Sequence, residues 1–554
     1  MYSDKKNILQ LVALLKAHSI IHIVVCPGSR NAPIVHTLAN CEDFKCYTVT
    51  DERSAGFFAI GLALRLNETV GVCCTSGSAV LNLQPAVSEA FYQRIPLVVI
   101  TADRPAAWIG QMDGQTLPQP NVFGTLVKKS VNLPEIHTTE DEWYCNRLIN
   151  EAILNTHFHN YGPVHINIPL SEPLFEFNTK ELPEVRTINR FSALEHSKEL
   201  EDYIRKCCQY EKILIIAGQD SMPFSVTENY PSSIFEQYTW FAEDLCNSIK
   251  NDKLIRNFDT ALYAMTTEEK KTMAPDVVIT LNGHIVSKRL KQYLRSNPPK
   301  EHIHVSPNGA IADVFCSLTV AVEQNTSDFI HLLSVGVDEH STTYSDKWQE
   351  ICSKIPEPEF AYSEMSAIAT LIHHLPKDSI LHLANSSTIR YAQLFKISSP
   401  TTVCCNRGIN GIEGSLSTAI GCASANPNQL NFIIIGDLSF FYDMNALWNS
   451  NYSSNVRILL LNNGSGEIFH SLPGLEMTTS SRGAITATHT TSAKGWAEER
   501  GFEYICINGA TSLEQNIKSF TTNGASDRPI LMEVRTDAAM DVKLLKDYYH
   551  QLKH

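Results

Sequence analysis

Two apolar runs near the C-terminal end of the chain, each followed at once by small polar residues, constrain its fold most strongly. Residues 432–439 (FIIIGDLS) and 458–466 (ILLLNNGSG) both change abruptly from apolar to polar. Such runs are typical of buried strands in a parallel sheet, and the intervening residues 440–451 have helical composition. Because consecutive parallel strands point the same way, we expect Asp437 and Asn463 to meet at the carboxyl edge of a sheet, where open α/β folds bind ligands.

The residue types at this edge indicate a particular chemistry. The Asp437 carboxylate, the Asn463 amide oxygen and the backbone carbonyl of Ser465 form an all-oxygen set that suits Mg²⁺ held jointly by a protein and a diphosphate. The adjacent glycines let backbone N–H groups approach phosphate oxygens. Either turn alone is more typical of an ordinary βα connection with a polar end. Together, at this spacing, they resemble the diphosphate–magnesium signature of thiamine-diphosphate (ThDP) enzymes.

The whole chain alternates short apolar runs with helical segments, which predicts three doubly wound parallel-sheet α/β domains. The resemblance implies that these domains are of the ThDP-enzyme type. We expect a first domain at 1–190, a central α/β domain at 191–335, a linker at 336–359 and a third domain at 360–554. The strands are expected at 20–26, 46–50, 69–75, 96–101 and 164–168, then at 212–217, 276–281 and 302–305, and finally at 380–383, 402–405, 432–435, 458–461, 503–507 and 529–534.

Composition narrows the class of protein. The formal net charge of −14 argues against a general nucleic-acid binder, although an acidic surface is compatible with a basic cleft for anions. No apolar run approaches 18 residues, so no membrane insertion is expected, and the lysine-containing N-terminus does not read as a signal peptide. The 15 cysteines include no C-x-x-C pair and are predicted to be reduced thiols of a cytoplasmic protein.

A ThDP enzyme also needs a carboxylate against the aminopyrimidine ring, and Glu52 is the candidate. It follows the strand expected at 46–50, and the small apolar residues after it would partly desolvate it and raise its pKa. Such a carboxyl group can hydrogen-bond a pyrimidine nitrogen and share its proton. An acid favoured at a helix N-terminus by the helix dipole is the alternative interpretation.

Six further stretches resemble one family, the 2-succinyl-5-enolpyruvyl-6-hydroxy-3-cyclohexene-1-carboxylate synthases of menaquinone biosynthesis. The likeness spans the chain and is weakest in the central region. It implies decarboxylation of 2-oxoglutarate and 1,4-addition of the succinyl carbanion equivalent to isochorismate, with ThDP and Mg²⁺, or Mn²⁺, as cofactors. It also implies a homodimer or homotetramer with sites at the subunit interface. The stretches are 27–33 (PGSRNAP), 51–57 (DERSAGF), 75–79 (TSGSA), 101–105 (TADRP), 406–414 (NRGINGIEG) and 462–469 (NNGSGEIF).

The resemblance also implies roles for individual residues. The two catalytic residues are Glu52 and Gln115, and the metal ligands are Asp437, Asn463 and Ser465. Cofactor contacts are implied at Glu52, Thr75, Gln115, Ser386, Gly408, Ile412, Asp437, Leu438, Ser439, Asn463, Ser465, Gly466, Ile468 and Phe469. Substrate contacts are implied at Ser29, Arg30, Arg104, Lys288, Arg289, Ser386, Arg390, Arg407, Ile468, Phe469 and Leu472.

The basic residues of this set suit substrates with two carboxylates each, because a guanidinium fork can pair a carboxylate through two hydrogen bonds. For each of them a surface salt bridge is the ordinary alternative. The chain departs from the family at Gly114, where an asparagine is frequent, and at Gly464 and Ser465.

Three other functions remain open. The chain could be an acetolactate-synthase-like ThDP carboligase or a 2-oxoacid decarboxylase, although the arginine set argues against small neutral acceptors. It could be a non-catalytic paralogue, although the presence of Glu52, Asp437 and Asn463 argues against this interpretation. A nicotinamide dehydrogenase is poorly supported, because no expected strand is followed by G-x-G-x-x-G.

Overall fold

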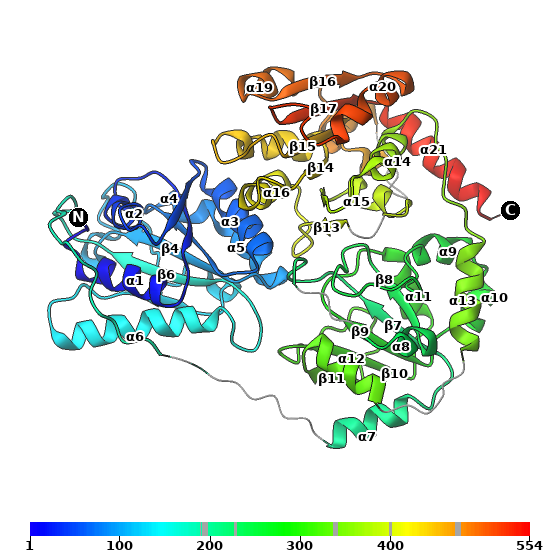
Figure 1. Ribbon diagram of the computed structural model, residues 1–554, viewed down its shortest axis with the longest axis horizontal. Helices are drawn as coiled ribbons and strands as arrows, with labels where there is room; N and C mark the ends of the chain where they lie inside the picture. The colour runs from blue at the N-terminus through cyan, green and yellow to red at the C-terminus, as the bar shows by residue number, and fades with distance from the viewer. Residues whose placement is uncertain are drawn as a thin grey trace.

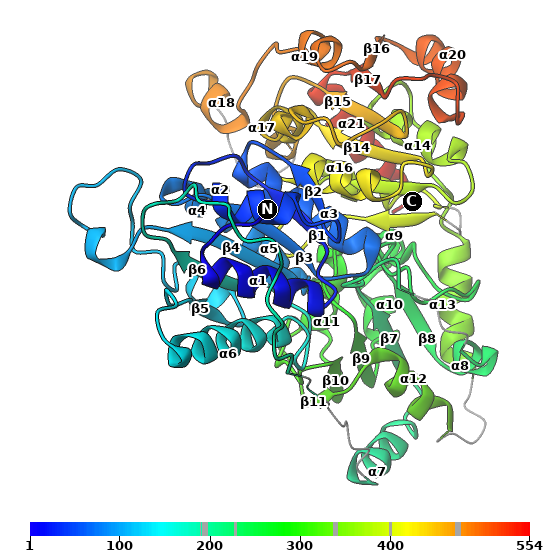
Figure 2. The ribbon, with the colours of Figure 1, turned by 60° about the vertical axis from the view of Figure 1, so that its left-hand side comes forward.

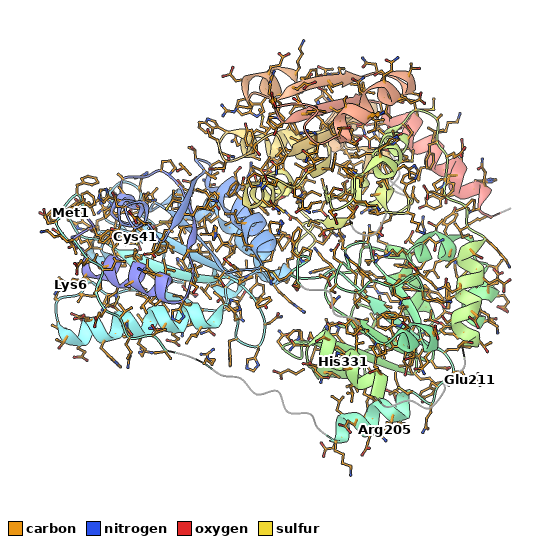
Figure 3. All side chains as sticks on the ribbon, viewed as in Figure 1. Met1, Lys6, Cys41, Arg205, Glu211 and His331 are labelled. Atoms are coloured by element: carbon orange, nitrogen blue, oxygen red, sulfur yellow. The ribbon has the colours of Figure 1, made fainter. Side chains whose placement is uncertain are left out.

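The computed structural model describes residues 1–188, 190, 198–225, 230–335, 342–397, 401–470 and 478–553. It contains three parallel sheets, each with helices on both faces, and these form three separate lobes (Figure 1). The predicted class of three doubly wound α/β domains is therefore confirmed. Met1, Lys6 and Cys41 lie at the end of the first domain that points away from the other two domains (Figure 3).

The first sheet has six parallel strands in the order β2-β1-β3-β4-β6-β5. Helices α1, α2 and α6 cover one face, and α3, α4 and α5 cover the other. The strands are β1 (His22–Val25), β2 (Lys45–Thr48), β3 (Val70–Cys74), β4 (Leu97–Asp103), β5 (Ser130–Asn132) and β6 (Val164–Pro169). The helices are α1 (Lys6–Ala17), α2 (Ala32–Ala39), α3 (Glu52–Leu66), α4 (Ser78–Asn82), α5 (Gln84–Gln93) and α6 (Thr139–Asn155), with the 3₁₀ turns η1 (Ala106–Trp108) and η2 (Gly124–Leu126).

The central sheet has five parallel strands in the order β11-β10-β9-β7-β8. Its strands are β7 (Ile213–Ala217), β8 (Thr239–Ala242), β9 (Val277–Leu281), β10 (Glu301–Ser306) and β11 (Val320–Glu323). Its helices are α7 (Lys198–Cys207), α8 (Ser232–Gln237), α9 (Phe258–Ala264), α10 (Thr267–Thr272), α11 (Lys288–Ser296), α12 (Thr326–Val335) and α13 (Thr343–Ser353).

Helix α13 falls within the segment expected to be a linker. Its Trp348 is fully buried and meets the ring of Phe241 on β8 edge-on, with 4.9 Å between ring centroids. Because this helix contributes to the core of the central sheet, we propose that the central domain extends through α13 and that the connection to the third domain begins after it.

The strands of the third sheet lie in the order β13-β12-β14-β15-β17-β16. When the strands of each domain are numbered from its own first strand, this is the same order as in the first sheet. Its strands are β12 (Ile380–Leu383), β13 (Thr402–Cys404), β14 (Asn431–Gly436), β15 (Val456–Asn462), β16 (Glu503–Ile507) and β17 (Ile530–Arg535). Its helices are α14 (Glu364–His374), α15 (Ser387–Ala392), α16 (Ser415–Ala425), α17 (Asp437–Tyr442), α18 (Thr479–Thr486), α19 (Lys494–Glu499), α20 (Ala510–Thr521) and α21 (Ala538–Gln551), with the 3₁₀ turns η3 (Met444–Leu447) and η4 (Glu467–His470).

Every expected strand is present, and the differences from expectation lie at sheet edges and in one helix. The edge strands β5 and β11, which are partly exposed, and the edge strand β8 were not predicted. Residues 440–451 were expected to be helical, but α17 ends at Tyr442. The next residue, Asp443, is fully buried, and its carboxylate accepts hydrogen bonds from the backbone N–H and the hydroxyl of Ser417, both at 2.8 Å.

The first and third domains meet through α3 and α16, which lie side by side in both ribbon views (Figures 1 and 2). Glycine permits this approach. A Cβ atom at Gly61 would lie 2.0 Å from the carbonyl oxygen of Thr418, and one at Gly421 would lie 2.2 Å from that of Phe58. The two helices are therefore packed backbone to backbone.

Substituting either glycine tests this packing. Gly61→Ala or Gly421→Ala should force the helices apart and lower the free energy of unfolding by about 1–3 kcal/mol, the usual penalty for overpacking. Gly495→Ala in α19 is the matched control, because a Cβ there meets no atom within 4 Å. It should be neutral or stabilising by about 0.5–1 kcal/mol, since alanine is the better helix residue. Denaturant unfolding of all three proteins checks the difference, and equal stabilities would contradict close packing.

Candidate active site

Four loops at the carboxyl edge of the third sheet carry predicted site residues. Ser386 follows β12, Arg407 follows β13, Asp437 follows β14 and Asn463 follows β15. The strand order reverses between β12 and β14, so Ser386 and Asp437 flank the point at which doubly wound sheets bind ligands.

These loops, with α11 of the central domain, line one cavity of about 510 Å³. The structure thereby brings together most of the site residues predicted in the third domain and one from the central domain. The predicted residues that line this cavity are Lys288, Ser386, Arg390, Arg407, Ile412, Asp437, Leu438, Ser439, Asn463, Ser465, Gly466, Ile468 and Phe469.

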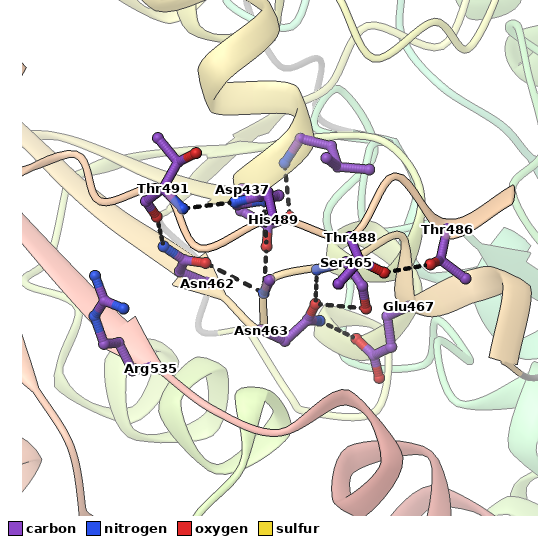
Figure 4. Close-up of polar contacts among 12 residues, drawn as sticks. Asp437, Asn462, Asn463, Ser465, Glu467, Thr486, Thr488, His489, Thr491 and Arg535 are labelled. Carbon is purple, nitrogen blue, oxygen red and sulfur yellow. Dashed lines mark hydrogen bonds and ion pairs between the residues drawn. The ribbon is translucent and has the colours of Figure 1, made fainter. Parts of the chain in front are cut away.

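Asp437 links the two loops that were expected to hold a metal ion. Its Oδ1 accepts a hydrogen bond from Leu438 N at 2.6 Å, and its Oδ2 accepts one from Gly464 N at 2.8 Å. Nε2 of His489 lies 3.3 Å from the same Oδ2 (Figure 4). The carboxylate is 4 % exposed, and this burial raises its pKa. A cation beside it would favour the charged form.

The Asn463 loop completes the oxygen set. Oδ1 of Asn463 accepts a hydrogen bond from Ser465 N at 2.9 Å (Figure 4). Gly464 between them has φ +75°, and a Cβ there would lie 2.8 Å from the carbonyl oxygen of His489, so the turn requires glycine. A carboxylate, a carboxamide oxygen and a backbone carbonyl on adjacent loops are hard ligands of the kind that fits Mg²⁺ bound together with a diphosphate.

Three buried acids that the sequence analysis missed lie beside this loop, and two of them, Glu364 and Glu467, also line the cavity. Glu364, Glu467 and Asp541 place carboxylate oxygens within 4.8 Å of one another. Burial, followed by the charge of Glu467, raises the pKa of Glu364 well above its usual value. Burial likewise raises the pKa of Glu467, and that of Asp541 to about 7. Proximity to the 462–466 motif could have drawn attention to Glu467, but no sequence signal marks the other two.

The cavity is also lined by basic residues. Nη1 of Arg407 donates to Asn385 Oδ1 at 2.9 Å. Partial burial, and then repulsion from Arg407, lower the pKa of Arg390. Across the described ranges, neither arginine forms a salt bridge with an acid. Lys291, one helical turn after Lys288 on α11, also lines the cavity and was missed; the i, i+3 spacing of two lysines was the available signal.

Two predicted residues lie beside the cavity rather than in it. Arg289 is ion-paired with Asp259 and donates from Nη1 to the hydroxyl of Tyr549 at 3.1 Å, and it lines an adjoining cavity of about 370 Å³. Gly408 is buried behind the wall, where its N–H donates to Oε1 of Glu89 at 2.8 Å. Leu472, predicted as a wall residue, lies outside the described residues.

The predicted residues of the first domain lie on the carboxyl edge of their own sheet, and none of them lines the cavity. Glu52 is the first residue of α3, is half-buried, and accepts a hydrogen bond from Asn82 at 3.5 Å. Gln115 is exposed and has φ +55°. Thr75 follows β3, and its buried hydroxyl has no hydrogen-bond partner among the described residues.

The remaining residues of this edge are one serine and two paired arginines. Ser29 is exposed. Arg30 is buried, donates to the carbonyl of Leu170 at 2.9 Å and pairs with Glu172 at 3.1 Å. Arg104 pairs with Asp113 at 3.3 Å. In a single chain both arginines therefore have acidic partners, unlike those of the third domain.

Comparison with known proteins defines the class to which this fold and site belong. The description "Thiamine pyrophosphate enzyme, N-terminal TPP binding domain" matches residues 9–123, and "Thiamine pyrophosphate enzyme, C-terminal TPP binding domain" matches residues 385–534. These two segments cover most of the first sheet and of the third. The chain is thus built on two thiamine-diphosphate-binding domains.

Full-length relatives identify the family. The chain is 58% identical to the 2-succinyl-5-enolpyruvyl-6-hydroxy-3-cyclohexene-1-carboxylate synthase of Phocaeicola vulgatus and 58% identical to that of Bacteroides thetaiotaomicron, over 100% of each chain. It is 34% identical to that of Porphyromonas gingivalis, over 99% of this chain and 97% of the relative. The chain belongs to this family, whose members are ThDP-dependent transferases, so the predicted family is confirmed and the acetolactate-synthase-like alternative is not supported.

Glu89 offers a test of how the Arg407 loop is held. Its buried carboxylate accepts hydrogen bonds from the N–H groups of Gly408 and Ile409, each at 2.8 Å. In Glu89→Gln the amide nitrogen would face one of these donors, so unfolding should become easier by about 1–3 kcal/mol. Hydrogen exchange should accelerate at both amides. Glu514→Gln, at an exposed position of α20, should change neither the free energy of unfolding nor the exchange of these amides. Unaltered exchange at Gly408 and Ile409 would show that Glu89 does not hold the loop.

Proposed function

We propose that this protein decarboxylates 2-oxoglutarate and adds the succinyl carbanion equivalent to isochorismate in a 1,4-addition, using ThDP and Mg²⁺ or Mn²⁺. The observation that carries the proposal is the polarity of one cavity. An oxygen-ligand set at Asp437, Asn463 and Ser465 lines the same cavity as Arg390 and Arg407, which have no acidic partner among the described residues. Such a cavity suits a metal-bound diphosphate beside dicarboxylate substrates.

Each residue of the cavity then has a defined task. Asp437, Asn463 and the Ser465 carbonyl would hold the metal ion, and the Ser386 and Ser439 turns would border the diphosphate. Bound ThDP would supply the electron sink for decarboxylation. Arg390, Arg407 and Lys288 would orient substrate carboxylates.

The first domain would supply the remaining groups. The Glu52 carboxyl group would hold a proton at a pyrimidine nitrogen, and the Gln115 amide would position a group that is being protonated. Ser29, Arg30 and Arg104 would face the second carboxylates of the substrates. The two arginines would then pair with substrate carboxylates in place of their acidic partners in the chain.

These first-domain residues do not line the cavity of their own chain, and this supports a site built by two subunits. The packing of α3 against α16 fixes the two edges relative to each other within one chain. The Glu52 edge of one chain would instead cover the Asp437 edge of another. We therefore propose a homodimer or homotetramer with sites related by two-fold symmetry.

We also place this reaction in the cytoplasm. All 15 cysteines are unpaired thiols, a state that a reducing compartment maintains. In addition, no helix in the described part of the chain is long and apolar enough to cross a membrane.

The decisive experiment supplies the purified protein with ThDP, Mg²⁺, 2-oxoglutarate and isochorismate, and follows CO₂ release and product mass. Pyruvate should not replace 2-oxoglutarate. Arg390→Ala should raise the apparent KM by a factor equivalent to about 2–5 kcal/mol, as expected when a buried carboxylate loses its charged partner. Its cofactor affinity should stay unchanged. Condensation of pyruvate in preference to 2-oxoglutarate would refute the assignment.

Subunit mixing tests the shared site. Glu52→Gln and Asp437→Ala subunits, each nearly inactive, are unfolded together and refolded. In a mixed dimer one site receives both substitutions and the other receives neither, so random pairing should leave about a quarter of all sites intact. A mixture no more active than its parents, although labelled subunits prove that mixed dimers form, would show that each site is built within one chain.

A further inference from the structure

The carboxamide of Asn463 donates hydrogen bonds to two buried acids. Its Nδ2 donates to Glu364 Oε1 at 2.8 Å and to Glu467 Oε2 at 3.2 Å (Figure 4 shows the second of these). The NH₂ end of the amide therefore faces this pair, and both acids also line the cavity. The Oδ1 end accepts a hydrogen bond from Ser465 N at 2.9 Å and so faces the Ser465 loop.

The two acids are themselves fixed by contacts from separate elements. Tyr391 on α15 donates from its hydroxyl to Glu467 Oε1 at 2.5 Å. Glu364 is the first residue of α14, and its backbone N–H donates to Asp541 Oδ1 on α21 at 3.2 Å. Glu364 and Glu467 are 3 % and 4 % exposed. Neither forms a salt bridge with a lysine or arginine in the described ranges, so ion pairing does not account for them.

Reversing the amide shows what the pair does. If the Asn463 side chain turned by 180°, it would lose both donated hydrogen bonds to the acids. Its NH₂ group would meet the N–H of Ser465 and point at the place where the ion binds, and both of these contacts would be repulsive. A single acceptor would leave the side chain free to rotate away, whereas two acceptors on different elements define its plane.

We propose that Glu364 and Glu467 are positioning residues that hold the Asn463 carboxamide with its oxygen directed at the metal ion of the cofactor. The inference rests on the proposed Mg²⁺ site. Mg²⁺ demands near-ideal octahedral geometry, whereas Ca²⁺ accepts irregular sites. A freely rotating Asn463 should therefore weaken Mg²⁺ binding more than Ca²⁺ binding.

The test measures metal affinity by calorimetry, in the presence of ThDP, on the full-length protein. Glu467→Met removes one acceptor at similar volume, and Glu364→Met removes the other. Loss of groups that orient a metal ligand typically weakens metal binding by about 10–100-fold, so we expect about tenfold for each variant and more for the double variant. The loss for Ca²⁺ should be smaller in every case.

Glu467→Gln is the conservative variant. Its amide oxygen can still accept from Asn463 while its NH₂ group donates to the hydroxyl of Tyr391, so Mg²⁺ affinity should return to within about threefold of wild type. Glu514→Met, the same change at an exposed position of this domain, should have no effect. If Glu467→Met does not fold, Tyr391→Phe releases the Glu467 carboxylate instead, and the same measurement applies.

Asp437→Ala, measured in parallel, separates the two levels of the proposal. If it abolishes Mg²⁺ binding while the methionine variants, or Tyr391→Phe in their place, bind Mg²⁺ within threefold of wild type, the positioning role is wrong and the metal site stands. If Asp437→Ala also leaves Mg²⁺ affinity unchanged, the metal site itself is wrong. A loss of threefold or more that is greater for Mg²⁺ than for Ca²⁺ supports the positioning role, and an equal loss for both ions contradicts it.

Discussion

The contact between α3 and α16 is the constraint on which the rest of the molecule depends. At Gly61 and Gly421 the two helices approach so closely that no side chain fits between them. Beside this contact, Arg53 donates to the carbonyl of Tyr442 at 2.7 Å and Asn445 donates to Asp51 at 3.0 Å. Residues next to Glu52 are thereby hydrogen-bonded to the last residue of α17 and to the 3₁₀ turn η3 that follows it. This packing sets the direction in which the carboxyl edge of each sheet faces. It therefore also keeps the two halves of the proposed site apart within one chain.

Hydrogen bonds between loops hold the candidate site residues of the third domain. Asp437 is bonded to the backbone of the neighbouring loop, Arg407 to Asn385, and Gly408 to Glu89 of the first domain. The loops therefore brace one another across the sheet edge. Binding energy from a cofactor would be used for contacts rather than for ordering the loops. The first-domain edge is different, because its arginines are occupied by acids and Gln115 is exposed.

Sequence patterns predicted the parts of this structure that local composition determines. The interior strands are almost wholly buried and were all expected, whereas β5, with three residues, and the half-exposed β11 carry too little apolar surface to signal themselves. Asp437 and Asn463 could be placed together because parallel strands end at one edge. The contact of Glu364 with Asn463 could not be predicted, because 99 positions of sequence separate the two residues and only the packing of α14 brings them together. The position of Arg289 likewise depends on Tyr549, which only the folding of α21 brings near.

The shared strand order of the first and third sheets gives the α3–α16 contact a further meaning. Each helix follows the second strand of its own domain, β2 or β13, so the contact joins equivalent surfaces of two domains with the same topology. A surface that binds its own equivalent is the arrangement of an isologous dimer. The chain thus holds, within one polypeptide, the kind of paired surface that an isologous dimer forms between two, and the covalent connection keeps the two domains at a fixed ratio of one to one.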